Sequence, residues 1–103
     1  MEMEETPERI IDIHKVENFL KNGLYSLVSK YLEKKLEELT KEEKGPNSKV
    51  VNLVMKELDE IRNLLPQYKP KGKNPFRKFS ANLSYVQVGL DINYYKKMFL
   101  ERA

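Results

Sequence analysis

The chain contains no cysteine, no tryptophan and a single histidine, His14, among its 103 residues. Without cysteine it can form no disulfide, no thiolate metal site and no thiol nucleophile. A lone histidine also argues against a transition-metal site, because such sites usually take three or four converging ligands, several of them histidine or cysteine. We therefore interpret His14 as a partly exposed helix residue and expect no metal and no cofactor.

Long hydrophobic runs are missing too. No stretch approaches the ~20 apolar residues that a membrane span needs, and residues 1–8 are acidic, without the apolar core of a secretory signal. The glycine-rich phosphate loop, the serine nucleophile elbow and the zinc-helix motif are also absent. From these absences we expect a cytoplasmic protein that is not an enzyme and does not bind membranes.

Charge is distributed unevenly along the chain. Residues 1–60 hold ten Lys and Arg against fourteen Asp and Glu, whereas residues 61–103 hold nine against two. Such a change of sign between halves indicates a charged partner. The abundance of Lys, Glu, Leu and Ile is typical of thermophilic proteins, while eight Asn residues argue against that origin.

The apolar periodicity predicts an all-α single domain, a small four-helix bundle over residues 1–103. The four helices are expected at about 7–22, 24–42, 48–65 and 80–102. Thr6 and Pro7 are typical of a helix start, and Asn22-Gly23 of a left-handed cap at its end. The alternative for Gly23 is a place inside one longer helix.

The two central helices are the clearest. Apolar residues recur at three- and four-residue steps in both, and they are Leu24, Leu27, Val28, Tyr31, Leu32, Leu36 and Leu39 in the first and Val51, Val54, Leu58, Ile61 and Leu65 in the second. Gly45-Pro46 lies between them, and Pro66 stops the second. We therefore expect a helical hairpin that turns at Gly45-Pro46.

The last element is ambiguous. Residues 84–93 alternate like a strand, which would have to pair across a dimer because the rest of the chain offers no second strand. The stripe of Leu83, Val86, Leu90, Tyr94 and Met98 also fits a helix. The helix is the favoured interpretation, and a homodimer is compatible with either.

Between the third and fourth helices we predict an extended basic hinge over residues 66–79. It contains five cations and three aromatic residues and no acid, and Pro66, Pro70, Gly72 and Pro75 interrupt it. Cations neutralise phosphates, and aromatic rings stack on unpaired bases. The residues predicted to bind nucleic acid are Lys69, Lys71, Lys73, Arg77, Lys78, Lys96, Lys97, Tyr68 and Phe76.

The sequence thus favours a non-enzymatic accessory protein or subunit that contacts the backbone of DNA or RNA with little sequence specificity. In size, helicity and charge the chain looks like the small helical subunits of multi-subunit nucleic-acid complexes, an analogy at the level of the fold alone. The alternative is a protein–protein interaction module, an adaptor, inhibitor or assembly subunit of a larger complex, with Tyr94, Tyr95 and Phe99 as interface residues. The basic hinge could also be a solvated connector with Phe76 and Phe79 as core anchors, or it could dock on the acidic face of residues 33–43 in the same chain. Exposure of these two phenylalanines would distinguish the interpretations.

Overall fold

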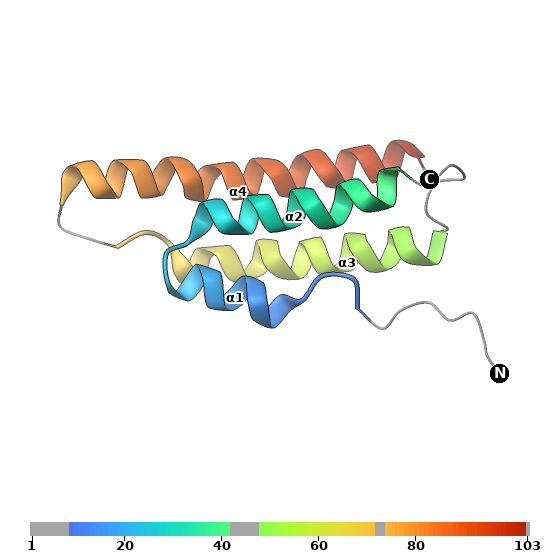
Figure 1. Ribbon diagram of the computed structural model, residues 1–103, viewed down its shortest axis with the longest axis horizontal. Coiled ribbons are helices and arrows are strands. Elements are labelled where there is room, and N and C mark those ends of the chain that lie inside the picture. The colour runs from blue at the N-terminus through green and yellow to red at the C-terminus, as the bar shows by residue number, and fades with distance from the viewer. Residues whose placement is uncertain (1–8, 42–47, 72–73, 103) are drawn as a thin grey trace.

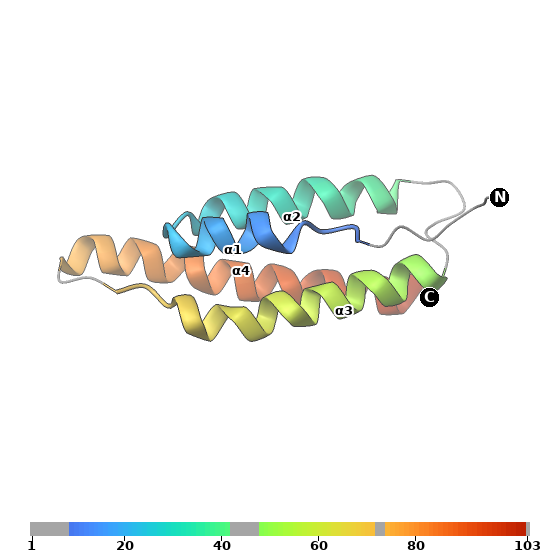
Figure 2. The ribbon, with the colours of Figure 1, turned by 90° about the horizontal axis from the view of Figure 1, so that it is seen from below.

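The computed structural model describes residues 9–41, 48–71 and 74–102. Four α-helices, α1 (Ile13–Lys21), α2 (Tyr25–Thr40), α3 (Ser48–Leu64) and α4 (Pro75–Arg102), and one 3-10 helix, η1 (Leu65–Tyr68), pack into an elongated bundle (Figure 1). Within these ranges there is no strand, so the all-α prediction is confirmed and the strand alternative for 84–93 is wrong. Helix α2 packs most extensively on α4, which also packs on α3, while α1 contacts both α2 and α3 (Figure 2).

The first helix begins later than predicted. Residues 7 and 8 lie outside the described residues, and residues 9–12 are not helical. The backbone N–H groups of Ile10 and Ile11 donate to the carboxylate of Glu57 on α3, at 3.2 and 2.9 Å. The Asp12 side chain then caps the helix by accepting from the Lys15 N–H at 3.1 Å. A buried carboxylate 46 residues away in the chain therefore sets the start of α1, which no local pattern could predict.

The end of α1 follows the prediction. Gly23 has a φ of +70°, the left-handed conformation that glycine adopts without steric cost. The Gly23 N–H donates to the Leu20 carbonyl at 3.1 Å, and the Leu24 N–H donates to the Phe19 carbonyl at 2.8 Å. These two bonds form the capping motif that ends many helices, so Gly23 does not lie inside a longer helix.

The core is apolar and continuous. Its buried members are Ile11, Val16, Leu20, Tyr25, Val28, Leu32, Leu36, Val51, Val54, Leu58, Ile61, Leu65, Val88, Ile92, Tyr95 and Phe99. All five residues predicted to face inward from α3 and its extension are buried. In α2 the prediction was partly wrong, because Leu24 and Leu27 are exposed and Tyr25 is buried instead. The predicted hairpin turn at Gly45-Pro46 lies outside the described residues. Helices α2 and α3 run antiparallel (Figure 1), but each packs on α1 and α4 rather than on the other.

The predicted basic hinge is shorter than expected. Residues 65–68 form η1, and α4 starts at Pro75 rather than at residue 80. The Asn74 side chain accepts from the Phe76 N–H at 3.0 Å, and proline suits the first position of a helix because its missing N–H would have no partner there. Asn74-Pro75 is thus the start of a helix, whereas the sequence analysis placed Pro75 inside an extended hinge.

Candidate functional site

The predicted nucleic-acid residues fall into two groups at different places on the bundle. Lys69 and Lys71 are exposed on the connection between η1 and α4, and Lys78 is exposed on the second turn of α4. Lys73 and the side chain of Arg77 lie outside the described residues. The lysines of the first group that the structure describes therefore lie on the connection that leads to α4 and on the beginning of α4.

Lys96 and Lys97 do not join this group. Lys96 lies eighteen positions after Lys78 in the same helix, or about 27 Å further along the helix axis. Lys96 also pairs with Asp59 on α3, which neutralises its charge locally. The prediction that these two lysines extend the basic patch has no support in the geometry.

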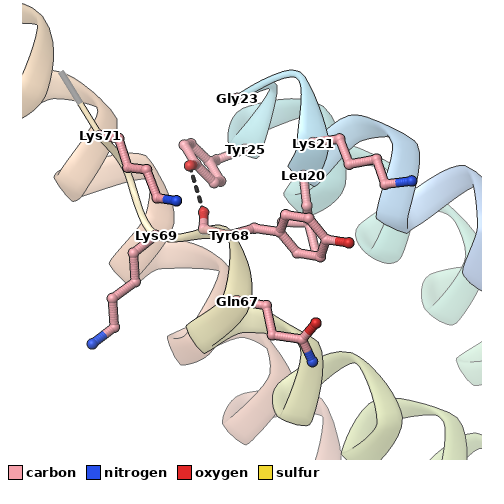
Figure 3. Close-up of a pocket in the computed structure, with 8 residues that line it drawn as sticks. All are labelled: Leu20, Lys21, Gly23, Tyr25, Gln67, Tyr68, Lys69 and Lys71. Carbon is pink, nitrogen blue, oxygen red and sulfur yellow. Dashed lines mark hydrogen bonds between the residues drawn. The ribbon is translucent and has the colours of Figure 1, made fainter.

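A pocket of about 310 Å3 lies beside the connection (Figure 3). It is lined by Leu20, Lys21, Gly23, Tyr25, Gln67, Tyr68, Lys69 and Lys71. Lys69 and Lys71 follow η1, whereas Lys21 comes from the last position of α1 on the other side of the pocket (Figure 3). The described lining contains three lysines and no acid, but the ammonium groups of Lys21 and Lys69 point away from each other (Figure 3).

Two hydrogen bonds hold Tyr68 in the wall of this pocket. The Tyr25 hydroxyl donates to the Tyr68 carbonyl at 2.7 Å, and the Tyr68 hydroxyl donates to Glu17 Oε2 at 2.8 Å. The bond to the Glu17 carboxylate raises the pKa of the Tyr68 phenol, because it favours the protonated form. Tyr68 also packs against the core, so its ring is less available for stacking than the sequence alone suggested.

Phe76 and Phe79 are not core anchors. Their exposed fractions are 86% and 66%, on the first turns of α4, which extend beyond the ends of α2 and α3 (Figure 1). Their exposure rules out the interpretation in which both rings are core anchors. Both rings are open to a ligand or to a partner.

They belong to a larger apolar surface. Seven large apolar residues of α4 have exposed fractions of 55–86%, and they are Phe76, Phe79, Leu83, Val86, Leu90, Tyr94 and Leu100. We call this set the outer face of α4. It lies opposite the buried face of the same helix, which consists of Val88, Ile92, Tyr95 and Phe99.

The sequence analysis recognised one of these two faces and misjudged part of the other. It identified the stripe of Leu83, Val86, Leu90 and Tyr94 without saying whether the bundle buries it, and it expected Tyr94, Tyr95 and Phe99 at an interface. Of its three proposed interface aromatics, Tyr94 alone is exposed, because Tyr95 and Phe99 are 6% and 0% exposed. The second apolar set was visible in the spacing 88, 92, 95 and 99, but periodicity cannot say which of two apolar faces a bundle buries.

The outer face also carries little charge. From Phe79 to Tyr94 the helix contains one residue that is charged at neutral pH, Asp91, and its carboxylate accepts from the Gln87 side chain at 2.8 Å. A helix whose back faces water normally carries charged residues on that side, as α2 does with Lys30, Glu33 and Lys34. The middle of α4 thus has the composition of a helix that is covered on both sides.

Other chemistry finds little support in the described residues. His14 is exposed on α1, and in the ranges that the structure describes no three His, Asp or Glu residues lie close enough to hold a metal ion. None of the helices described is both long enough and apolar enough to cross a membrane.

Comparison with protein-family models, with curated proteins and with solved structures found no match to this chain.

Proposed function

We propose that this chain is a non-enzymatic interaction module, a subunit or adaptor that binds a protein surface through the outer face of α4. The observation that carries the proposal is the exposure of seven large apolar side chains on one side of a single helix. Taking roughly 200 Å2 for a fully exposed large side chain, the fractions above correspond to about 900 Å2. The largest apolar patch on a typical monomer is about 300–600 Å2, and larger ones mark interaction sites.

Photo-crosslinking tests this proposal in the cells that produce the protein. We expect a benzophenone amino acid at Leu83 or Leu90 to form a defined protein–protein product. The matched control carries the same group at Lys56, an exposed position on α3 away from the outer face. Products at Leu83 and Leu90 no more abundant than those at Lys56 would contradict the proposal.

A second candidate function is contact with a nucleic-acid backbone, as the sequence suggested. The three lysines that line one pocket, Lys21, Lys69 and Lys71, support it, together with exposed Lys78 and Phe76 on the first turns of α4. Lysines at a chain connection can follow successive phosphates, and each such contact releases counterions. Nucleic-acid contact would use only the basic end of the molecule, by which we mean Lys21, Lys69, Lys71 and Lys78, and it requires no base-specific contact.

Fluorescence anisotropy with labelled single-stranded DNA, duplex DNA and RNA tests it at low and near-physiological salt. We expect the Lys69→Ala/Lys71→Ala variant to bind more weakly, with a salt slope lower by ~1 for each phosphate that the variant no longer neutralises. The control is Lys49→Ala/Lys56→Ala, which removes two exposed lysines from α3. Equal binding by the two variants, or no binding at low salt, would rule out a role for the basic end.

A further inference from the structure

The outer face of α4 has the spacing of a surface made to pack on another helix. Its members follow each other at steps of 3, 4, 3 and 4 from Phe76 through Phe79, Leu83 and Val86 to Leu90. Continuing these steps reaches positions 93, 97 and 100, and Leu100 is again exposed and apolar. This heptad spacing places one continuous stripe along a helix, and two such stripes interdigitate side by side.

We infer that a second copy of this chain covers the outer face, with the two α4 helices packed antiparallel. The inference rests on the function proposed above, that the outer face is a protein interface, and it names the partner. The same stripe on both copies is complementary to itself about a two-fold axis, which is the commonest symmetry of homo-oligomers.

The area of the face fits this occupant. A standard stable interface buries ~800 Å2 on each partner, and the outer face presents about 900 Å2 by the estimate above. The whole face would therefore be covered by a matching stripe of equal length. Because α4 has 28 residues, or about 42 Å of helix, a second α4 supplies that length.

The position of α4 leaves room for the second copy. The helix forms one edge of the bundle, with α2 and α3 packed on its other side (Figure 1). Two α4 helices can thus meet through their outer faces while the rest of each bundle lies on the far side of the pair. No described helix has to move.

Charge selects the antiparallel arrangement. A parallel pair would set Lys97 of one copy against Lys97 of the second copy within the stripe, and it would bring both basic connections to the same end. Like charges facing each other across a helix pair are destabilising. An antiparallel pair separates the two basic ends by the length of the helix.

The register follows from covering the whole stripe. Full overlap from Phe76 to Leu100 places the two-fold axis at residue 88, so Phe76 of one copy lies opposite Leu100 of the second copy. Lys97 then lies opposite Phe79 of the second copy, where an ammonium can sit on an aromatic ring. This ring contact accommodates Lys97, and the other polar residue of the stripe, Asn93, lies opposite Leu83 of the second copy.

Cysteine crosslinking tests both the partner and the orientation. The chain has no native cysteine, so a short bis-maleimide reacts with introduced thiols alone. In the antiparallel dimer the Phe76 positions of the two copies are about 36 Å apart along the axis, as are the Leu100 positions. We expect the double variant Phe76→Cys/Leu100→Cys to form a covalent dimer, and each single variant to stay uncrosslinked. Both residues are exposed, so the substitutions leave the core intact.

The control is Lys34→Cys/Lys56→Cys, two exposed positions on α2 and α3, which measures crosslinking by random collision. A covalent dimer from Phe76→Cys alone would overturn the antiparallel arrangement in favour of a parallel one. No crosslink above that control in any variant would overturn the second copy as the occupant. In that case photo-crosslinks from Leu83 and Leu90 to a different protein would still support the proposed interaction function.

Discussion

Glu57 provides the sharpest test of how the chain positions its first helix. Its side chain is 1% exposed, and among the described residues Glu57 is the one charged residue that is buried. The carboxylate accepts from the backbone N–H groups of Ile10 and Ile11, and the Arg9 guanidinium lies 3.6 Å from Oε2. Replacing Glu57 by Ala removes the acceptor and leaves these N–H groups without their partner.

The magnitude follows from these contacts. A hydrogen bond to a charged group contributes about 1.5–3 kcal/mol, and an unsatisfied buried donor costs about 1–3 kcal/mol. The Ile11 bond is buried and the Ile10 bond is partly buried. We therefore expect Glu57→Ala to lower the free energy of unfolding by about 3–4 kcal/mol. Glu57→Gln keeps an acceptor oxygen and loses the charge, so it should cost about 1 kcal/mol.

Urea unfolding followed by helical circular dichroism, at one fixed protein concentration, measures this difference. With a denaturant slope of about 1.5–2 kcal/mol per M, the midpoint of Glu57→Ala should fall by about 2 M. The control is Glu60→Ala, which loses a partly exposed ion pair with Arg9 at 3.6 Å and should cost no more than about 0.5 kcal/mol. If Glu57→Ala were as stable as Glu60→Ala, the carboxylate would not be what anchors the segment before α1.

Three further predictions concern other parts of the bundle. Gly23→Ala should lower the free energy of unfolding by about 1 kcal/mol because the φ of Gly23 is +70°. Gly89→Ala should raise it by about 0.5–1 kcal/mol, because Gly89 lies inside α4 and nothing is within 4 Å of the added Cβ. Equal effects of the two substitutions in urea unfolding would contradict the assigned backbone conformations. Leu58→Ala should cost about 2–5 kcal/mol in the same assay, because Leu58 is fully buried, and a loss below about 1 kcal/mol would exclude it from the core. Burial, with smaller contributions from nearby acids, raises the pKa of the Tyr95 phenol to about 12 from its ordinary value of 10.0. The folded state then holds this proton more tightly than the unfolded state, so stability is intact below pH 10 and falls as the pH rises toward 12. Absorbance at the phenolate band should show a late tyrosine ionisation that Tyr95→Phe removes, and its persistence in that variant would refute the assignment.

Parts of the fold could be predicted from sequence because one local pattern determined them. In α3 the apolar residues occupy a single stripe, so the predicted inward face and the observed one coincide. The left-handed cap at Gly23 could likewise be predicted, because glycine adopts a positive φ without steric cost. The start of α1 could not be predicted, because it depends on hydrogen bonds to Glu57, which is 46 residues from Ile11.

Helix α4 shows a different limit. Both of its faces are apolar, so periodicity identified a helix without telling which side the bundle buries. For the candidate basic site, the sequence found Lys69 and Lys71 but missed Lys21, which reaches the same pocket from the end of α1. It also grouped Lys96 and Lys97 with them, although the length of α4 separates the two sets.

Sedimentation equilibrium of the full chain, with and without Leu90→Glu, tests most directly whether the outer face of α4 is an interface between two copies of this chain. We expect the unmodified chain to have twice the mass of a single chain at micromolar concentration. Leu90→Glu should sediment as a folded monomer, because a carboxylate at this exposed position opposes contact with a second apolar stripe but leaves the core intact. An unmodified chain that stays monomeric across the concentration range, or a Leu90→Glu variant that still dimerises, would contradict the self-association of α4.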